Sequence, residues 1–162
     1  MPILMKRENF PYDPEIIKSS SPEETAAIGE KIGGLLEKGS VLGLRGMLGA
    51  GKTCLIKGIA KNLEIDDEIT SPTYTIVSEY ECKKNNEKIP FYHIDAYRLK
   101  GDDDFAALGG EEYIYGNGIT VIEWSEKISA SLPPYTIFIE IEITGANSRN
   151  IRIINQNEHS GN

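Results

Sequence analysis

Cysteine is scarce in this sequence. Cys54 and Cys82 are the only two cysteines among 162 residues, and they do not form a Cys-x-x-Cys pair. The sequence therefore offers neither a disulfide framework nor the usual spacing of a zinc site. No apolar run approaches the length that spans a bilayer, and the first residues lack the pattern of a signal peptide. We therefore expect a cytoplasmic protein that works in a reducing compartment and has no membrane segment.

Positive charge is also limited. The chain has 17 Lys and Arg against 25 Asp and Glu, which gives a formal net charge of −8 at pH 7. This balance argues against a surface that neutralises many nucleic-acid phosphates, so we expect any link to RNA to run through a partner protein. The content of 40% hydrophobic and 26% charged residues is that of an ordinary globular protein. The length predicts one domain with a proper core.

A phosphate-binding loop is the most informative feature that is present. Residues 46–53 read Gly-Met-Leu-Gly-Ala-Gly-Lys-Thr and match the pattern G-x-x-x-x-G-K-[ST]. The glycines let successive backbone N–H groups point at phosphate oxygens, while Lys52 contacts the β- and γ-phosphates and the Thr53 hydroxyl binds Mg²⁺. A mostly apolar segment at 40–45 precedes the loop, and apolar residues at helical spacing follow it. This order predicts a site for a nucleoside triphosphate or diphosphate, above the positive end of a helix dipole.

The apolar pattern predicts a three-layer α/β sheet with several antiparallel pairs and few helices. Ser21 and Pro22 are a typical helix start, and Gly39 is the expected stop. The other expected elements are strands at 76–80, 89–94, 119–122, 137–143 and 151–154, a polar turn at 83–88 and a short acidic helix at 102–108. Strand 137–143 alternates isoleucine with other residues, so we expect a half-buried edge strand. We divide the chain into a lead-in at 1–18, one domain at 19–154 and a polar tail at 155–162.

Two acidic residues stand directly after apolar strands. Asp95 follows one strand and could hold Mg²⁺ or position an attacking water. Glu123 follows the next strand and could hold the same Mg²⁺ together with Thr53. Their simpler interpretations are a turn Asp and a surface Glu. Trp124, the only tryptophan, is equally well interpreted as a packing residue. His93 alternates with apolar residues on its strand, which favours a core residue or one that supports a ligand.

A short segment rich in hydroxyl groups lies beyond the helix that follows the phosphate loop. Residues 71–75 read Ser-Pro-Thr-Tyr-Thr. In proteins with a phosphate-binding loop, a segment in this region often senses the γ-phosphate and Mg²⁺ and orders when they bind. We expect Ser71 and Thr73 to belong to such a loop.

Together these segments resemble the TsaE (YjeE-type) ATPases, small P-loop proteins that support threonylcarbamoyladenosine formation in bacterial tRNA. The matching segments are residues 48–53, 71–75, 92–99 and 122–127, followed by Leu132-Pro133. The resemblance runs from about residue 20 to residue 154 and implies one P-loop α/β domain, with a parallel core sheet flanked by antiparallel strands. It also implies binding of ATP or ADP with Mg²⁺, slow ATP hydrolysis by the protein alone, and association with the TsaD and TsaB proteins.

The resemblance also implies a role for individual residues. The expected catalytic residues are Lys52, Thr73, Asp95 and Glu123. The expected nucleotide contacts are Ser21, Gly49, Ala50, Gly51, Lys52, Thr53, Cys54 and Trp124, with 147–149 near the base. The expected Mg²⁺ ligands are Thr53, Asp95 and Glu123. The chain departs from the family pattern at Met47, where the family usually has Asp, and at Cys54, where it commonly has Thr. Met47 is expected to alter the hydrolysis rate more than phosphate binding.

Three other functions remain open. A small-molecule kinase usually adds a lid with arginines that clamp the transferred phosphate, but this chain shows no obvious lid insertion. Its five arginines are Arg7, Arg45, Arg98, Arg149 and Arg152. A GTPase is disfavoured because the sequence has no Asn-Lys-x-Asp segment to recognise guanine. A non-catalytic module, in which nucleotide only switches affinity for a partner, shares every predicted binding residue with the ATPase.

Overall fold

The computed structural model describes residues 16–46, 51–69 and 76–155. These residues form one seven-stranded sheet in the order β1-β7-β6-β2-β5-β4-β3. The strands are β1 (Ile16–Ser19), β2 (Val41–Gly46), β3 (Val77–Lys84), β4 (Glu87–Asp95), β5 (Ile119–Glu123), β6 (Ile137–Ile143) and β7 (Arg149–Asn155). The helices are α1 (Pro22–Leu35), α2 (Lys52–Asn62), α3 (Asp102–Ala107) and α4 (Glu111–Ile114), with a 3-10 segment, η2 (Ser125–Ser131). None of these helices is long and apolar enough to cross a membrane.

The centre of the sheet is parallel and its flanks are antiparallel. Strand β2 pairs in parallel with both β5 and β6, and β4 pairs in parallel with β5. Strands β3 and β7 run antiparallel to their inner neighbours, and β1 pairs antiparallel with β7. This arrangement confirms the predicted fold class. The strand that leads into the phosphate loop therefore lies in the middle of the sheet.

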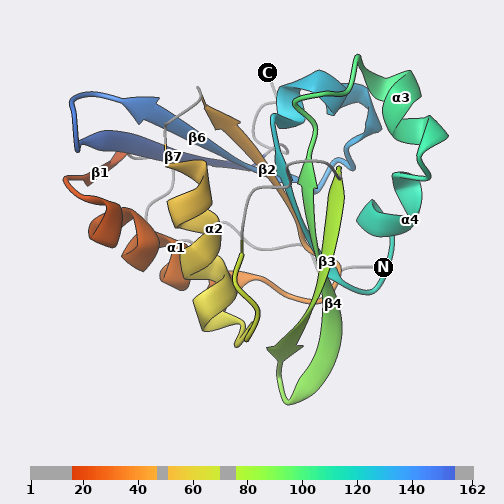
Figure 1. Ribbon diagram of the computed structural model, residues 1–162, viewed down its shortest axis with the longest axis horizontal. Coiled ribbons are helices and arrows are strands. Elements are labelled where there is room, and N and C mark those ends of the chain that lie inside the picture. Colours follow the sequence, from red (N-terminus) through yellow and green to blue (C-terminus); the bar gives the residue numbers. More distant parts are fainter. Residues whose placement is uncertain (1–15, 47–50, 70–75, 156–162) are drawn as a thin grey trace.

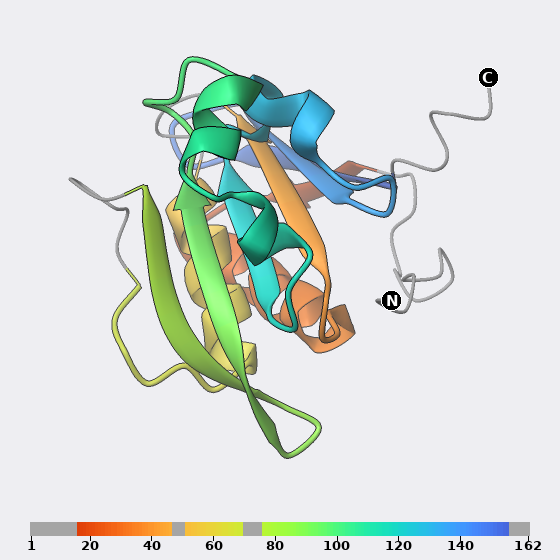
Figure 2. The same cartoon turned by 90° about the vertical axis from the view of Figure 1, so that its right-hand side faces the viewer.

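The sheet is the central layer of three. Helices α1 and α2 pack on one face, while α3, α4 and η2 lie over part of the other (Figures 1 and 2). Strand pleating directs alternate side chains to the two faces. On β2, Leu42 and Leu44 join the apolar cluster beneath α1 and α2, while Val41 joins the cluster beneath α3 and η2. The two buried clusters together fix β2 and the segment that follows it.

Local signals placed several elements correctly. The Ser21 hydroxyl accepts a hydrogen bond from the Glu24 N–H (3.1 Å) and caps α1, as predicted. The expected turn at 83–88 is a two-residue hairpin turn in which Asn85 and Asn86 have φ angles of 52° and 63°. The predicted stop at Gly39 is wrong, because α1 ends at Leu35 with Leu36 as its C-cap, and Gly39 lies in the turn that follows.

Two further expectations are corrected by the structure. Strand β6 is not an edge strand, because β2 and β7 flank it. Its alternation reflects a difference in burial between its two faces, because Ile139 and Ile141 are buried whereas Glu140 is half-buried and Glu142 is exposed. Residues 16–18 are not an irregular lead-in, because they pair with β7 as part of β1. Residues 1–15 of the expected lead-in and 156–162 of the expected tail lie outside the described residues.

Close packing of α1 on α2 depends on glycine. A Cβ added at Gly58 would overlap the carbonyl oxygen of Ala26, and one added at Gly29 would overlap that of Leu55. The two helices therefore touch backbone to backbone. Their contact holds the start of α2 against the sheet, where the phosphate loop ends.

We expect Gly58→Ala to lower the free energy of unfolding by about 2 kcal/mol, because the helices must separate to admit the methyl group. Urea unfolding followed by circular dichroism measures the change. Gly34→Ala in α1 is the matched control, since its Cβ meets nothing closer than the Asn62 side chain at 3.4 Å. The control is expected to raise stability by about 0.5 kcal/mol through helix propensity. Equal stability of the two variants would show that the helices have room to move apart.

Candidate nucleotide site

Helix α2 begins directly after the phosphate loop and places Lys52 in its first turn. Gly51 caps the helix with a φ of 101°, a conformation that glycine adopts at little cost. The Lys52 side chain is buried, and its Nζ donates a hydrogen bond to the Gly46 carbonyl oxygen at 2.7 Å. The same ammonium lies 3.7 Å from the centroid of the Trp124 ring. The lysine therefore links the last residue of β2 to the residue that follows β5.

Burial is the largest influence on the Lys52 ammonium and lowers its pKa. The nearby carboxylates of Glu123, Glu126 and Asp95 act in the opposite direction and raise the pKa, in that order of strength. A buried cation with three carboxylates near it is thus held at the N-terminal, positive end of a helix. The start of α2 is thus suited to an anionic ligand, such as a phosphate group, that is bound together with a metal cation.

The two predicted acidic residues lie side by side. In the parallel pair β4–β5, Asp95 is opposite Glu123, and the Ala96 N–H donates to the Glu123 carbonyl oxygen (3.0 Å). Glu123 is in turn opposite Leu44 of β2, so β4 and β5 end at one level of the sheet and β2 continues two residues further, to Gly46. Asp95 accepts a hydrogen bond from the Tyr97 N–H (3.0 Å), and burial raises the pKa of its carboxyl group. The structure therefore brings Lys52, Asp95 and Glu123 together, as predicted.

The donor atoms at this site suit Mg²⁺. Carboxylate oxygens of Asp95 and Glu123 and the hydroxyl of Thr53, the second residue of α2, are the hard ligands that Mg²⁺ prefers. Within the described ranges, no group of three or more His, Cys, Asp and Glu side chains could hold a metal ion. Protein atoms alone would leave the octahedral shell incomplete, which fits an ion that also binds phosphate and water.

Trp124 closes one side of the site. It follows β5 in a left-handed conformation (φ 58°), and its ring lies 5.1 Å from that of Tyr97, centroid to centroid. It is partly buried against the apolar cluster beneath η2. The predicted place near the nucleotide and the alternative of a packing residue are therefore compatible, because one face packs while Lys52 contacts the ring.

Sequence reasoning missed the partner of His93. The imidazole Nε2 lies 2.6 Å from Oε2 of Glu123, and both side chains are buried. The sequence predicts that His93 is a core residue or supports a ligand, and it does not predict a partner. The available signal was its position two residues before Asp95, which puts both side chains on the same face of β4.

A small cavity lies beside the start of α2. It has a volume of about 130 Å³ and brings Ser21 near residues that are distant in the sequence. Its lining consists of Ser21, Pro22, Thr25, Gly51, Cys54, Ala146, Asn147 and Arg149. The guanidinium of Arg149 is held by the carbonyl oxygens of Gly145 and Ser148 (3.0 and 2.8 Å). Ser21, Cys54, Asn147 and Arg149, all expected near the nucleotide, thus meet around one cavity.

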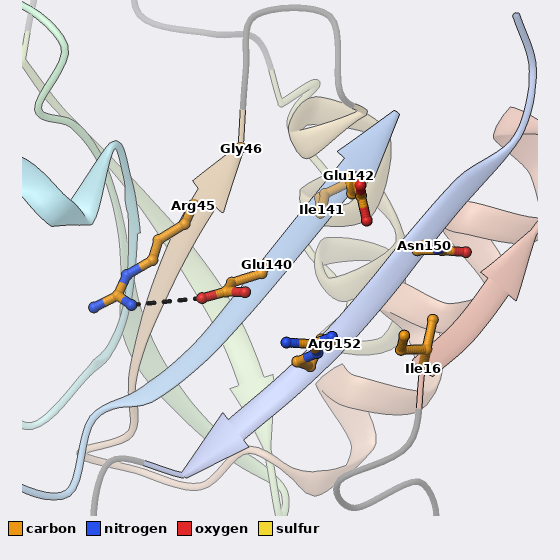
Figure 3. A pocket seen from close by; sticks show the side chains of 8 residues that line it. All are labelled: Ile16, Arg45, Gly46, Glu140, Ile141, Glu142, Asn150 and Arg152. Carbon is orange, nitrogen blue, oxygen red and sulfur yellow. Dashed lines mark ion pairs between the residues drawn. The ribbon is translucent and has the colours of Figure 1, made fainter. Parts of the chain in front are cut away.

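Another cavity, of about 320 Å³, lies on the uncovered face of β6, β7 and β2 (Figure 3). Its charges largely compensate one another, and Arg45 lies 3.7 Å from Glu140. It shares only Gly46 with the site around Lys52. The acidic pair and the lysine lie elsewhere, so we place the candidate site at the start of α2.

Several predicted residues lie outside the described residues. These are Gly49 and Ala50 of the phosphate loop, together with Met47, and Ser71 and Thr73 of the expected sensing loop. Their proposed contacts remain predictions.

Comparison with known proteins identifies a family whose model covers the residues of this site. Residues 19–151 match the family model "Threonylcarbamoyl adenosine biosynthesis protein TsaE". The tRNA threonylcarbamoyladenosine biosynthesis protein TsaE of Treponema pallidum is 43% identical over 135 residues, which cover 83% of this chain and 96% of the relative. The protein of the same name from Bacillus subtilis is 40% identical, with 83% and 81% covered. The crystal structure of Bacillus subtilis YdiB aligns with a TM-score of 0.67 at 35% identity and covers 90% of this chain and 88% of that one.

Proposed function

Because this chain belongs to the TsaE family of threonylcarbamoyladenosine biosynthesis proteins, we propose that it is a Mg²⁺-dependent ATPase serving that modification of tRNA. The observation that carries the proposal is the convergence of Lys52, Asp95 and Glu123 at the start of α2. A cation for phosphate and two acids for a metal-bound nucleotide are the parts that phosphoryl transfer to water requires.

Some residues of the site bind the nucleotide and Mg²⁺, and others assist hydrolysis. Lys52 leaves the Gly46 carbonyl to contact the β- and γ-phosphates, above the N–H groups at the start of α2. Thr53 and Glu123 hold Mg²⁺, with Asp95 beside them. When bound, Mg²⁺ neutralises charge on the phosphate oxygens. Asp95 orients the attacking water, since its carboxylate lies at the end of β4 next to Glu123.

Base and ribose are proposed to lie toward the small cavity. Its lining carries the Ser21 hydroxyl, the Asn147 amide and the Arg149 guanidinium, together with Gly51 and Cys54 on either side of Lys52 in the sequence. These polar groups can orient a nucleoside without a dedicated guanine-reading segment. We propose ATP and ADP as the nucleotides on this basis.

The proposed partners are the TsaD and TsaB proteins, with tRNA reached only through them, in the cytoplasm. The net charge of −8 supports contact with protein rather than with nucleic acid. A partner is proposed to complete or reset the site, because slow hydrolysis alone must become repeated turnover in the assembly. Residues 98–104 combine Arg98 with three acids next to the site and are a candidate contact for it.

The test is Mg²⁺-dependent ATP hydrolysis by the purified chain, with and without the TsaD–TsaB pair of its own organism. We expect slow release of phosphate by the chain alone and at least about tenfold stimulation by the pair, since a completed site lowers the barrier. Nucleotide binding with no turnover in either mixture would instead favour the non-catalytic switch. Phosphorylation of a small-molecule acceptor would favour the kinase.

A further inference from the structure

The pleat of two neighbouring strands explains how His93 reaches Glu123. His93 and Asp95 are two residues apart on β4 and therefore share a face. On β5, Val121 is opposite His93, and Glu123 is opposite Asp95. His93 is thus the diagonal neighbour of Glu123, at a distance that a long side chain can bridge. The short contact follows from the register of the parallel pair.

The contact is a hydrogen bond with a defined direction. Oε2 of the Glu123 carboxylate can only accept, so the imidazole Nε2–H donates across the 2.6 Å separation. The side chain of His93 is fully buried, and that of Glu123 is 5% exposed. A bond from a neutral or charged donor to a buried carboxylate is stronger than one between two neutral groups. The bond therefore restricts the rotation of Glu123.

Core packing alone does not account for His93. Among the described residues, its buried Nδ1 has no hydrogen-bond partner, so the ring buries polar atoms for a single contact. Strands β4 and β5 are already joined by their backbone hydrogen bonds. An apolar ring would fill this space at lower cost. What histidine adds is a donor aimed at one oxygen of Glu123.

We propose that His93 is a positioning residue for the metal-binding carboxylate of Glu123. By occupying Oε2, it would leave Oε1 to bind the cation, and it would hold the carboxylate near Lys52 and Asp95. Supporting bonds of this kind orient metal ligands in many sites. The inference rests on the proposed function in one respect, the assignment of Glu123 as an Mg²⁺ ligand.

The experiment measures metal affinity instead of turnover. Mn²⁺, a spectroscopic substitute for Mg²⁺, is titrated into the protein with saturating ADP, and free Mn²⁺ is followed by electron paramagnetic resonance. His93→Phe keeps an aromatic ring but removes the donor, and we expect Mn²⁺ affinity to fall about 10- to 100-fold. His93→Gln places an amide donor near the position of Nε2, and we expect it to recover most of the affinity. ADP affinity without metal should change less than about twofold in both variants, because neither substitution touches the phosphate contacts.

Glu123→Gln separates failure of the inference from failure of its premise. If Glu123→Gln weakens Mn²⁺ binding and His93→Phe does not, the positioning role is overturned and the metal site stands. If Glu123→Gln has no effect, the metal assignment itself is wrong. Equal loss in His93→Phe and His93→Gln, together with weaker metal-free ADP binding, would show a merely structural role.

Wild-type protein offers a test that does not depend on folding of a variant. The chain has only two histidines, His93 and His159, so ¹⁵N-histidine spectra are simple to assign with His159→Gln. We expect the His93 Nε2 signal to remain that of a protonated donor and to shift when Mg²⁺ is added to the ADP complex. A signal that does not respond to Mg²⁺ would overturn the proposal.

Discussion

Replacing Lys52 by alanine is expected to abolish nucleotide binding while the protein remains folded. Lys52 is buried at the start of α2, where charges act through a low effective dielectric. Removing one partner of a buried, hydrogen-bonded charge pair costs roughly 2–5 kcal/mol. We therefore expect the affinity for ADP to fall by at least about 100-fold, which titration of a fluorescent ADP analogue measures.

Stability should respond much less to this substitution. Burial lowers the pKa of Lys52, which means that the folded protein holds the ammonium against a desolvation cost. Alanine removes that cost along with the bond to Gly46 and the contact with Trp124, so the losses and the gain partly cancel. Lys57→Ala is the matched control, because Lys57 is exposed on the same helix. Equal ADP affinity in wild type and Lys52→Ala would refute the phosphate-loop assignment.

Strands that consist mostly of apolar residues were predictable from the sequence. Strands β4 and β5 are mostly apolar before Asp95 and Glu123, so both strands and the acids at their ends were predictable, although β4 begins at Glu87, inside the predicted turn. The family prediction is likewise confirmed, because it depends on the order of motifs along the chain. Strand β1 was missed, since four residues are too few to show a period of two. It is stabilised by pairing with β7, a contact between the two ends of the domain.

Strand β6 shows how a correct pattern can lead to a wrong position. Its alternation reports that one face is partly open, whereas an edge strand lacks a neighbour. Glu140 is half-buried and Glu142 is exposed, and β7 still pairs along the whole strand. The local sequence shows which side chains of a strand are buried and which are exposed. The strand order depends on which segments pair, which a single sequence does not contain.

The same distinction applies to the site. Lys52, Asp95 and Glu123 could be grouped in advance, because topology alone brings the ends of parallel strands and the start of the next helix to one edge. The bond between His93 and Glu123 requires the exact register of β4 and β5. The approach of Ser21 to Arg149 requires the path of the 144–148 turn. Both are consequences of three-dimensional placement.

Asp95→Asn is expected to bind nucleotide and lose turnover. Asparagine keeps an oxygen that can accept the Tyr97 N–H bond, so the end of β4 should stay in place. It removes the negative charge that would orient and accept a proton from the attacking water, which typically contributes about 100- to 10,000-fold in rate. We expect the rate of ATP hydrolysis with the TsaD–TsaB pair to fall at least about 100-fold, with ADP affinity within about threefold of wild type.

Thermal unfolding gives this prediction a second, independent readout. Burial raises the pKa of Asp95, so the folded protein binds its proton more tightly than the unfolded chain does. The stability linked to this proton is present below the unfolded pKa and is lost as the pH rises through the folded pKa. At pH 7 the charged carboxylate of Asp95 therefore lowers the stability of the folded protein, and asparagine has no such charge. Asp95→Asn should unfold at the same temperature as wild type or higher. Asp66→Asn, at an exposed position between α2 and β3, should change neither rate nor stability. A wild-type rate in Asp95→Asn would leave Asp95 as the turn residue that holds Tyr97, and hydrolysis would then depend on Glu123 and the sensing loop.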